Sequence, residues 1–130
     1  MILLDTHVVL WLALQPEKIS PKATKAIQAS RSSGDGLCIS PISLWEIAQL
    51  VERNRVKLNI PLEAFLDMTE RNFLILPINA KIAYFAQQFS DAYPRDPADR
   101  MIGATALIEG ISLVTSDDRI RRSGEVQTIW

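Results

Sequence analysis

The chain has 130 residues, 48% of them hydrophobic and 22% charged, which is typical of a globular protein rather than of a disordered or fibrous one. Its 14 lysines and arginines nearly balance 15 aspartates and glutamates, so any contact with nucleic acid must come from a local patch rather than a basic field over the whole molecule. The single cysteine, Cys38, and the single histidine, His7, exclude an intramolecular disulfide, a cysteine-rich zinc site and a site built from several imidazoles.

Short apolar runs alternate with helical patterns along the chain. The apolar runs predict buried strands, and Ser-Pro or Asn before an apolar-periodic stretch predicts the start of a helix. In chain order, the expected elements are a strand at 2–4, a helix from 6 or 7 to 14, a helix at 21–30, a strand at 37–39, a helix at 41–53, a helix at 61–71, a strand at 73–76, a helix at 79–89, a helix from about 96 to 109, a strand at 111–115 and a short strand at 126–129. Gly110 is expected to end the last helix, since glycine is favoured just after a helix C-terminus.

This alternation predicts an α/β fold with a mainly parallel sheet that helices cover on both faces. The chain has no internal repeat, no low-complexity segment and no linker long enough to divide it, so residues 1–130 are expected to form a single domain. In open sheets of this kind, ligands bind beyond the carboxyl ends of the strands. The residues that follow the strands are therefore the first place to search for a site.

The apolar opening MILLDTHVVLWLAL lacks the basic region of a secretion signal, and Asp5 and His7 interrupt it. No apolar run approaches the roughly 20 residues that cross a bilayer. Cys38 lies in the apolar run Leu37–Ile39 and is interpreted as a small buried hydrophobe. A cytoplasmic protein that does not contact a membrane is therefore expected.

Four or five acidic residues are expected near one edge of the sheet. Asp5 and Asp117 directly follow predicted strands. Glu46 lies about one and a half turns into the helix after the second strand, and Asp96 and Asp99 lie at the start of a later helix. Each also has a structural interpretation: a helix cap for Asp5 or Asp96, an Asx turn for Asp117, and a solvent-facing position for Glu46.

Taken together, these acids indicate a metal site. Several carboxylates in one cleft repel one another and lose solvation, so they need protons or a cation. Without a cysteine or histidine cluster, an all-oxygen site favours a hard ion such as Mg²⁺ or Mn²⁺. Such an ion polarises a phosphoryl oxygen and lowers the pKa of bound water, which favours hydrolysis of a phosphodiester.

Four stretches carry a family resemblance: MILLDTHVVLW, SPISLWEIAQL, DPADRMIGATAL and LVTSDDRI. In this order and spacing they resemble PIN-domain ribonucleases, and more closely the VapC-type toxins of bacterial type II toxin–antitoxin systems. The resemblance spans Ile2 to Ile120. It implies a three-layer α/β/α sandwich with a central, mainly parallel sheet of about four or five strands. It also implies a metal-dependent endoribonuclease that uses one or two Mg²⁺ or Mn²⁺ ions and a metal-activated water, and leaves a 5′-phosphate and a 3′-hydroxyl.

Matched to the family motifs, the catalytic and metal-binding acids are Asp5, Glu46, Asp99 and Asp117. Asp99 aligns with the family acid that opens the helix leading into MIGATAL, so it is preferred as a ligand. Asp96 is an additional acid, interpreted as an N-cap or an outer residue of the site. Asp99→Asn is accordingly expected to abolish activity, and Asp96→Asn to leave a measurable part.

Further residues are expected beside the cluster, namely Asp96, Thr115, Thr6, His7 and Arg100. Thr115 is expected to place a hydroxyl next to the ligands, and His7 is interpreted as a helix-start or neighbouring residue rather than a ligand. Arg100 has two interpretations, a contact with RNA phosphates and an ordinary solvated position.

The resemblance also implies partners: an RNA substrate, a small cognate antitoxin and a second copy of the chain in a homodimer. Trp11 and Trp45 lie at apolar helical positions, which favours the core over stacking on a base. Selectivity for RNA is expected to lie in the rim of the cleft and in loops such as 31–36 and 53–61.

Three alternatives remain to be weighed. A phosphatase of the haloacid dehalogenase type needs a second aspartate two positions after Asp5, where this chain has His7. A receiver-type domain expects an acidic pair near the first strand and a lysine after a late strand, where this chain has Asp117. The more serious alternative is a PIN-fold module that has lost catalysis and acts only by binding protein.

Overall fold

The computed structural model describes residues 1–130 and contains one five-stranded sheet. The strands are β1 (Ile2–Leu4), β2 (Leu37–Ile39), β3 (Leu74–Ile75), β4 (Ser112–Val114) and β5 (Thr128–Ile129). Their order is β3-β2-β1-β4-β5, and every neighbouring pair is parallel. The α/β class with a parallel sheet, predicted from the sequence, is confirmed.

Helices occupy the connections between these strands. They are α1 (Thr6–Leu14), the 3₁₀ helix η1 (Pro16–Lys18), α2 (Pro21–Ser33), α3 (Pro41–Glu52), α4 (Leu62–Asn72), α5 (Ala80–Ala86), α6 (Pro97–Glu109) and α7 (Asp118–Ser123). The side chains of Ser20, Ser40, Asn79 and Asp96 each accept a backbone N–H in the first turn of the following helix. The start signals in the sequence therefore act as predicted, since a cap needs only its own neighbours.

The predicted elements differ from the structure mainly at their ends. Helix α2 runs on to Ser33, where Gly34 adopts a left-handed conformation (φ 78°), and α5 ends at Ala86 rather than near residue 89. The sequence does not predict η1 or α7. Both are short, and α7 (DRIRRS) has only one buried apolar residue, Ile120, so it carries no helical periodicity.

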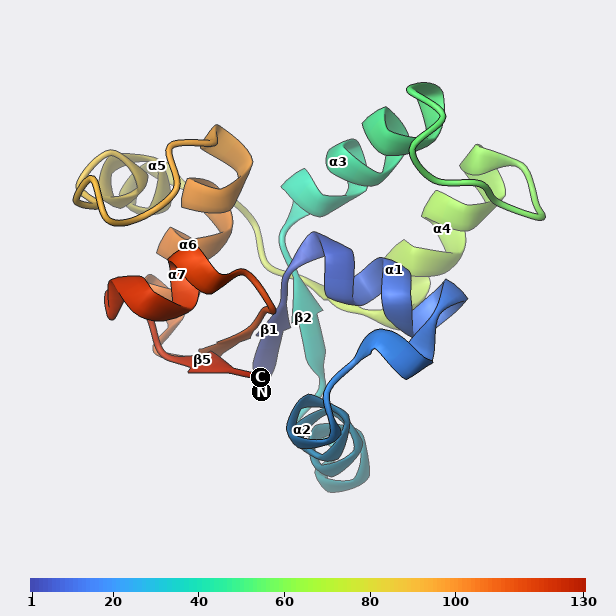
Figure 1. The fold of residues 1–130 in the computed structure, drawn as a ribbon, viewed down its shortest axis with the longest axis horizontal. Coiled ribbons are helices and arrows are strands. Elements are labelled where there is room, and N and C mark those ends of the chain that lie inside the picture. The colour runs from blue at the N-terminus through green and yellow to red at the C-terminus, as the bar shows by residue number, and fades with distance from the viewer.

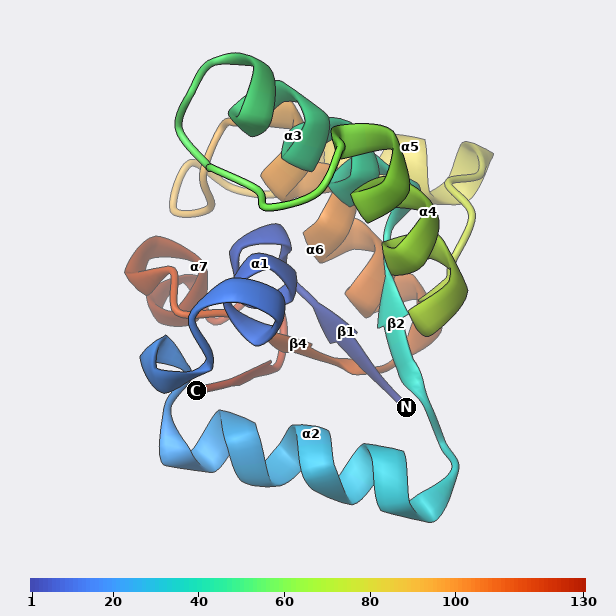
Figure 2. The ribbon, with the colours of Figure 1, turned by 90° about the vertical axis from the view of Figure 1, so that its right-hand side faces the viewer.

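Alternate residues of the strands face opposite layers of helices. Leu4, Ile39 and Val114 belong to a core that includes residues of α1, α2, α3 and α4. Leu3, Cys38 and Leu113 belong to a second core, together with residues of α6 and α7. Figures 1 and 2 show the resulting three layers, with the short sheet between the two groups of helices. Cys38 is fully buried, as predicted.

The pairing of β1, the central strand, with β4 brings the start of α1 beside the loop that follows β4. Leu4 pairs with Val114, and the N–H of Asp5 continues the ladder by donating to the Val114 carbonyl at 3.0 Å. Asp5 and Thr115 therefore leave the sheet at the same edge, beyond the carboxyl ends of the parallel strands. No helix in the chain has the length and apolar character needed to span a membrane.

Candidate metal centre

Asp5 is buried at the end of β1, with both carboxylate oxygens bound by donors from the chain. The N–H of Thr6 donates to Oδ1 at 2.8 Å, and the hydroxyl of Thr115 donates to Oδ2 at 2.7 Å. Asp5 is only 4% exposed and Thr115 is fully buried. The hydroxyl expected beside the acids is therefore present, and it fixes the orientation of the Asp5 carboxylate.

The loop after β4 holds Asp117 next to this pair. The N–H of Asp117 donates to the Thr115 hydroxyl oxygen at 3.1 Å. Oδ1 of Asp117 accepts the backbone N–H groups of Arg119 (2.9 Å) and Ile120 (3.1 Å), so this acid is also the N-cap of α7. Thr115 is thus the link that connects the two acids at the ends of β1 and β4.

His7 ties the same loop to α1. Its Nε2 accepts the N–H of Ser116 at 3.1 Å and lies 2.9 Å from the Ser116 hydroxyl, while Nδ1 lies 3.6 Å from Oδ2 of Asp5. A ring nitrogen that accepts an N–H has no proton of its own and no lone pair left for a metal. His7 therefore lies beside the acids, and its Nε2 is engaged in a hydrogen bond to the loop after β4.

Glu46 reaches the acids from α3. The Thr6 hydroxyl donates to Oε1 of Glu46, and Oγ of the buried Ser43 lies 2.9 Å from the same threonine oxygen. Burial raises the pKa of Glu46, the Thr6 hydrogen bond opposes this rise, and the charges of Asp5 and Asp96 add to it. Glu46 therefore points inward, a direction that its neighbours in the sequence leave undecided.

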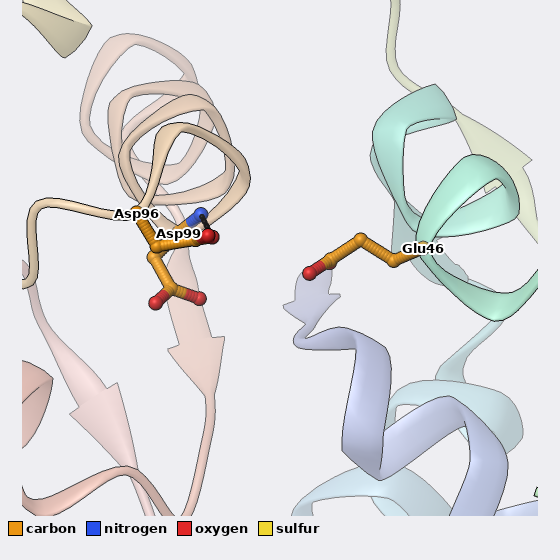
Figure 3. Close-up of side chains that lie close together, drawn as sticks. All are labelled: Glu46, Asp96 and Asp99. Atoms are coloured by element: carbon orange, nitrogen blue, oxygen red, sulfur yellow. Dashed lines mark hydrogen bonds between the residues drawn. The ribbon is translucent and has the colours of Figure 1, made fainter. Parts of the chain in front are cut away.

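Asp96 and Asp99 face Glu46 from the start of α6. Oδ2 of Asp96 accepts the N–H of Asp99 at 3.1 Å, which makes Asp96 the N-cap. Figure 3 shows the three side chains converging from the two helices, and one oxygen from each lies within 4.8 Å of the others. Three carboxylates from α3 and α6 thus meet across a small gap.

The pKa of Asp99 shows most clearly the effect of burying several acids close together. Its pKa is raised from 3.8 to about 8, first by burial and then by the charges of Asp5, Asp96, Glu46 and Asp117. All four other acids thus act on this one carboxyl group. Without a counter-ion, this group retains a proton near neutral pH, because ionising it adds another negative charge to a partly desolvated cluster.

The structure brings the four expected acids near one another, together with Asp96. The tightest group of oxygens is Glu46, Asp96 and Asp99, so Asp96 belongs to the cluster even though it is exposed and caps a helix. Asp5 and Asp117 lie at the strand ends and are held by hydrogen bonds of the chain. The sequence does not predict this division, because it depends on how α6 packs against the sheet.

Tyr93 is a residue near the site that the sequence does not indicate. It is fully buried, its ring stacks on Phe89 at 4.1 Å, and its hydroxyl donates to the Asp99 carbonyl at 2.9 Å. A Cβ at Gly103 would overlap the tyrosine hydroxyl, so only glycine lets this ring lie against α6. In the sequence, the only sign that another group packs so closely against α6 is Gly103 inside the predicted helix.

Two of the outer residues differ from expectation. The guanidinium of Arg100 donates to four backbone carbonyls, those of Pro94 (2.9 Å), Ala86 (3.3 Å), Phe89 (3.2 Å) and Ser90 (3.3 Å). These bonds tie α6 to the end of α5, so neither a phosphate contact nor an ordinary solvated position describes this side chain. Trp45, predicted to lie in the core, is 56% exposed, whereas Trp11 packs half-buried against the core.

The donor set suits a hard cation. It consists of carboxylate oxygens from Asp5, Glu46, Asp96, Asp99 and Asp117, with no sulfur atom and with the one imidazole already engaged. Oxygen ligands and excess negative charge favour Mg²⁺ or Mn²⁺ over softer metals. The raised pKa of Asp99 supports this fit: burial is its largest cause, and a divalent cation would relieve the further rise that comes from repulsion between the carboxylates.

Comparison with known proteins gives one family and several structural neighbours. The family model described as PIN domain matches residues 2–126. Ribonuclease VapC22 of Mycobacterium tuberculosis (strain ATCC 25618 / H37Rv) is 36% identical over 131 aligned positions, which cover 99% of this chain and 98% of that protein. The chain also resembles the solved structure of DNA-bound VapBC from Salmonella typhimurium, with a TM-score of 0.72, 20% identity and coverage of 98% of this chain and 97% of that one. VapBC2 from Rickettsia felis, bound to a DNA fragment from its promoter, has a TM-score of 0.70, 18% identity and the same two coverages.

Proposed function

The chain belongs to the PIN-domain family, and from that premise we propose that it is a metal-dependent endoribonuclease, the toxin of a type II toxin–antitoxin system. Its curated relative is a ribonuclease at 36% identity across nearly the whole of both chains. Membership of this family also removes the phosphatase and receiver alternatives. The remaining alternative is a PIN-fold module without catalysis.

The convergence of acids from α3, α6 and the ends of β1 and β4 is the observation that carries the catalytic proposal. A binding module has no need for five carboxylates gathered so closely that burial, and then their mutual repulsion, raises the pKa of Asp99 to about 8. Such a cluster lowers the stability of the protein unless a cation or protons neutralise it. A metal-dependent function accounts for this arrangement.

In this proposal Asp5, Glu46, Asp99 and Asp117 would hold Mg²⁺ or Mn²⁺, and Asp96 would add negative charge at the same place. When bound, the ion supplies Lewis-acid polarisation of the scissile phosphate and a nucleophilic water at neutral pH. We propose one or two ions at this site.

The residues around the acids hold them in place. Thr115 keeps the Asp5 carboxylate in one orientation, and the Thr6 hydroxyl turns Glu46 toward the cluster. Tyr93 fixes the first turn of α6 through the Asp99 carbonyl. Because these groups are ordered before RNA arrives, substrate binding does not have to pay for their orientation.

The partners are inferred from relatives of the same fold. The two structural neighbours are VapBC assemblies, so we propose a small antitoxin as the cognate partner of this chain. We propose the cytoplasm as the place where the chain meets RNA. We also propose a homodimer. Trp45 and Tyr84, which are 56% and 62% exposed, are large apolar side chains available for protein contacts.

The test is cleavage of a mixed RNA pool with Mg²⁺ or Mn²⁺, with EDTA and Asp5→Asn as controls. We expect cleavage that both controls abolish, and fragments with a 5′-phosphate and a 3′-hydroxyl when the ends are sequenced. Cleavage that survives both controls contradicts the metal mechanism. No cleavage of any pool, from protein with a normal melting curve, supports the non-catalytic module instead.

A further inference from the structure

A pocket of about 540 Å³ lies between α1, η1 and the segment that follows α3. We call it the Trp11 pocket, and its lining includes Trp11, Lys18, Arg55 and Lys57. His7 lines the same pocket, and its Nδ1 lies 3.6 Å from Oδ2 of Asp5. The pocket therefore begins next to the carboxylate cluster and extends away from it along α1.

The turn after α3 directs basic side chains into this pocket. Asn54 adopts a left-handed conformation (φ 56°), the N–H of Arg55 donates to the Leu50 carbonyl at 2.8 Å, and that of Asn54 donates to the Val51 carbonyl at 3.0 Å. These two bonds form the Schellman arrangement that reverses a chain at the end of a helix. The chain is thereby turned back from the end of α3.

After this turn the burial of successive residues alternates. Val56 and Leu58 are half-buried and pack against the core, whereas Arg55, Lys57 and Asn59 are exposed and line the pocket, which Val56 also touches. The basic side chains are thus presented to the pocket by packing of their neighbours.

The charge of the pocket has one sign. Lys18, Arg55 and Lys57 line it and no acid does, and none of the three forms an ion pair. Arg95 and Arg121 elsewhere are paired with aspartates. In a chain with a net charge of −1, three unpaired cations around one pocket are the local basic patch that contact with nucleic acid requires.

Trp11 adds an aromatic surface that its neighbours hold in place. The His7 ring meets it edge-on at 4.9 Å, the Trp130 ring lies at 5.8 Å, and the Lys18 ammonium lies 5.7 Å from the centre of the Trp11 ring. Proteins that bind single-stranded nucleic acid combine such an aromatic ring with cations that follow the backbone. The pocket has both features.

We propose that the Trp11 pocket binds the RNA strand on one side of the scissile phosphate, with Lys18, Arg55 and Lys57 at backbone phosphates and Trp11 against a base or ribose. This inference rests on the proposed ribonuclease function and adds where the substrate lies. The cations would offset the repulsion between RNA phosphates and the acids.

The test separates binding from cleavage. In Asp99→Asn protein, which cannot consume the probe, fluorescence anisotropy measures affinity for a labelled single-stranded RNA of mixed sequence over a range of salt concentrations. The Lys18→Ala, Arg55→Ala, Lys57→Ala combination is compared with a control of matched charge, Lys22→Ala, Lys25→Ala, Arg71→Ala, which alters exposed residues of α2 and α4.

The pocket combination is expected to weaken binding at least about tenfold at moderate salt. It should also reduce the slope of log affinity against log salt by about 2, because each phosphate of a single strand that a cation no longer neutralises lowers the slope by about 0.7. The control combination should change neither quantity. Equal affinity in the pocket combination and its parent, or an equal loss in the control, overturns this inference while leaving RNA cleavage by the wild type intact. If the wild type itself neither binds nor cleaves RNA, the proposed function has failed first.

Discussion

Two parts of the acidic site are built in opposite ways. At the end of β1, both oxygens of Asp5 accept hydrogen bonds, from Thr6 and Thr115, and the residue is only 4% exposed. At the start of α6, Asp99 lies among other acids, and burial together with their charges raises its pKa to about 8. One carboxylate is stabilised by the chain, and the other is destabilised by it.

The difference shows which carboxylate the chain itself stabilises and which one needs a cation. The chain supplies donors that fix the position of Asp5, at a place defined by the pairing of β1 with β4. It supplies no counter-charge for the cluster that surrounds Asp99. A metal ion or a proton has to neutralise that cluster. In metal-free protein, replacing Asp5 and replacing Asp99 should therefore change the melting temperature in opposite directions.

The largest expected effect on RNA cleavage comes from removing the charge of Asp5 or that of Asp99. Asp5→Asn and Asp99→Asn should each lower RNA cleavage by about 10³-fold or more, because loss of metal-based activation corresponds to several kcal/mol of transition-state free energy. Melting in EDTA at pH 7.5 should then distinguish them. Asp5→Asn should lower Tm, since an amide can accept only one of the two donors properly and a buried charge-assisted bond contributes about 1.5–3 kcal/mol. Asp99→Asn should raise Tm, because it removes a carboxylate that the folded chain destabilises. A lower Tm in both variants would contradict the contrast between Asp5 and Asp99.

A smaller loss is expected when the support of Asp5 is removed instead of Asp5 itself. Thr115→Val deletes the hydroxyl that holds Oδ2 of Asp5 and accepts the N–H of Asp117, with little change of shape. Loss of such an outer hydrogen bond reduces metal affinity or activity by about 10–100-fold. Cleavage should be titrated against Mg²⁺ concentration, and Thr105→Val, which removes another buried hydroxyl outside the cluster, is the matched control. An identical Mg²⁺ requirement in wild type and Thr115→Val would show that Asp5 needs no such support.

The pH dependence of Tm in the metal-free protein tests whether the folded chain destabilises the Asp99 carboxylate. The pKa of Asp99 is higher in the folded chain (about 8) than its usual 3.8, so ionising it costs stability. The cost is absent below about pH 4, grows as the pH rises toward 8, and stays constant above that. In EDTA, Tm should fall by at least a few degrees relative to Asp99→Asn across this window. Added Mg²⁺ should restore more of the Tm at pH 8 than at pH 5, and a Tm difference that does not vary with pH would contradict the crowding of charge at Asp99.

The smallest effect is expected at Asp96, the acid that both caps α6 and joins the cluster. Asparagine is as good an N-cap as aspartate, so Asp96→Asn removes the charge and keeps the helix start. We expect cleavage to fall only about two- to fivefold, equivalent to less than about 1 kcal/mol, with little change in Tm. Asp96→Ala, measured in parallel, should additionally lower Tm because the cap is absent. Complete loss of cleavage in Asp96→Asn would instead make Asp96 a direct ligand.

The sequence by itself determined what depends on near neighbours. Apolar runs, start signals at Ser20, Ser40 and Asn79, and the order of strands and helices follow from local periodicity and capping, and they agree with the structure. The position of the acids directly after strands, together with four motifs, was sufficient to indicate the family. These features need no knowledge of how distant segments pack.

Only the tertiary structure decided which atoms meet. The hydroxyl that holds Asp5 comes from Thr115, 110 positions away, and it arrives there through the pairing of β1 with β4. Packing of α6 on α5 turned Arg100 toward backbone carbonyls, and the turn at Asn54 brought Arg55 to the same pocket as Trp11. Partners of this kind are set by the register and packing of elements far apart in the chain, and a local pattern of residues does not encode them.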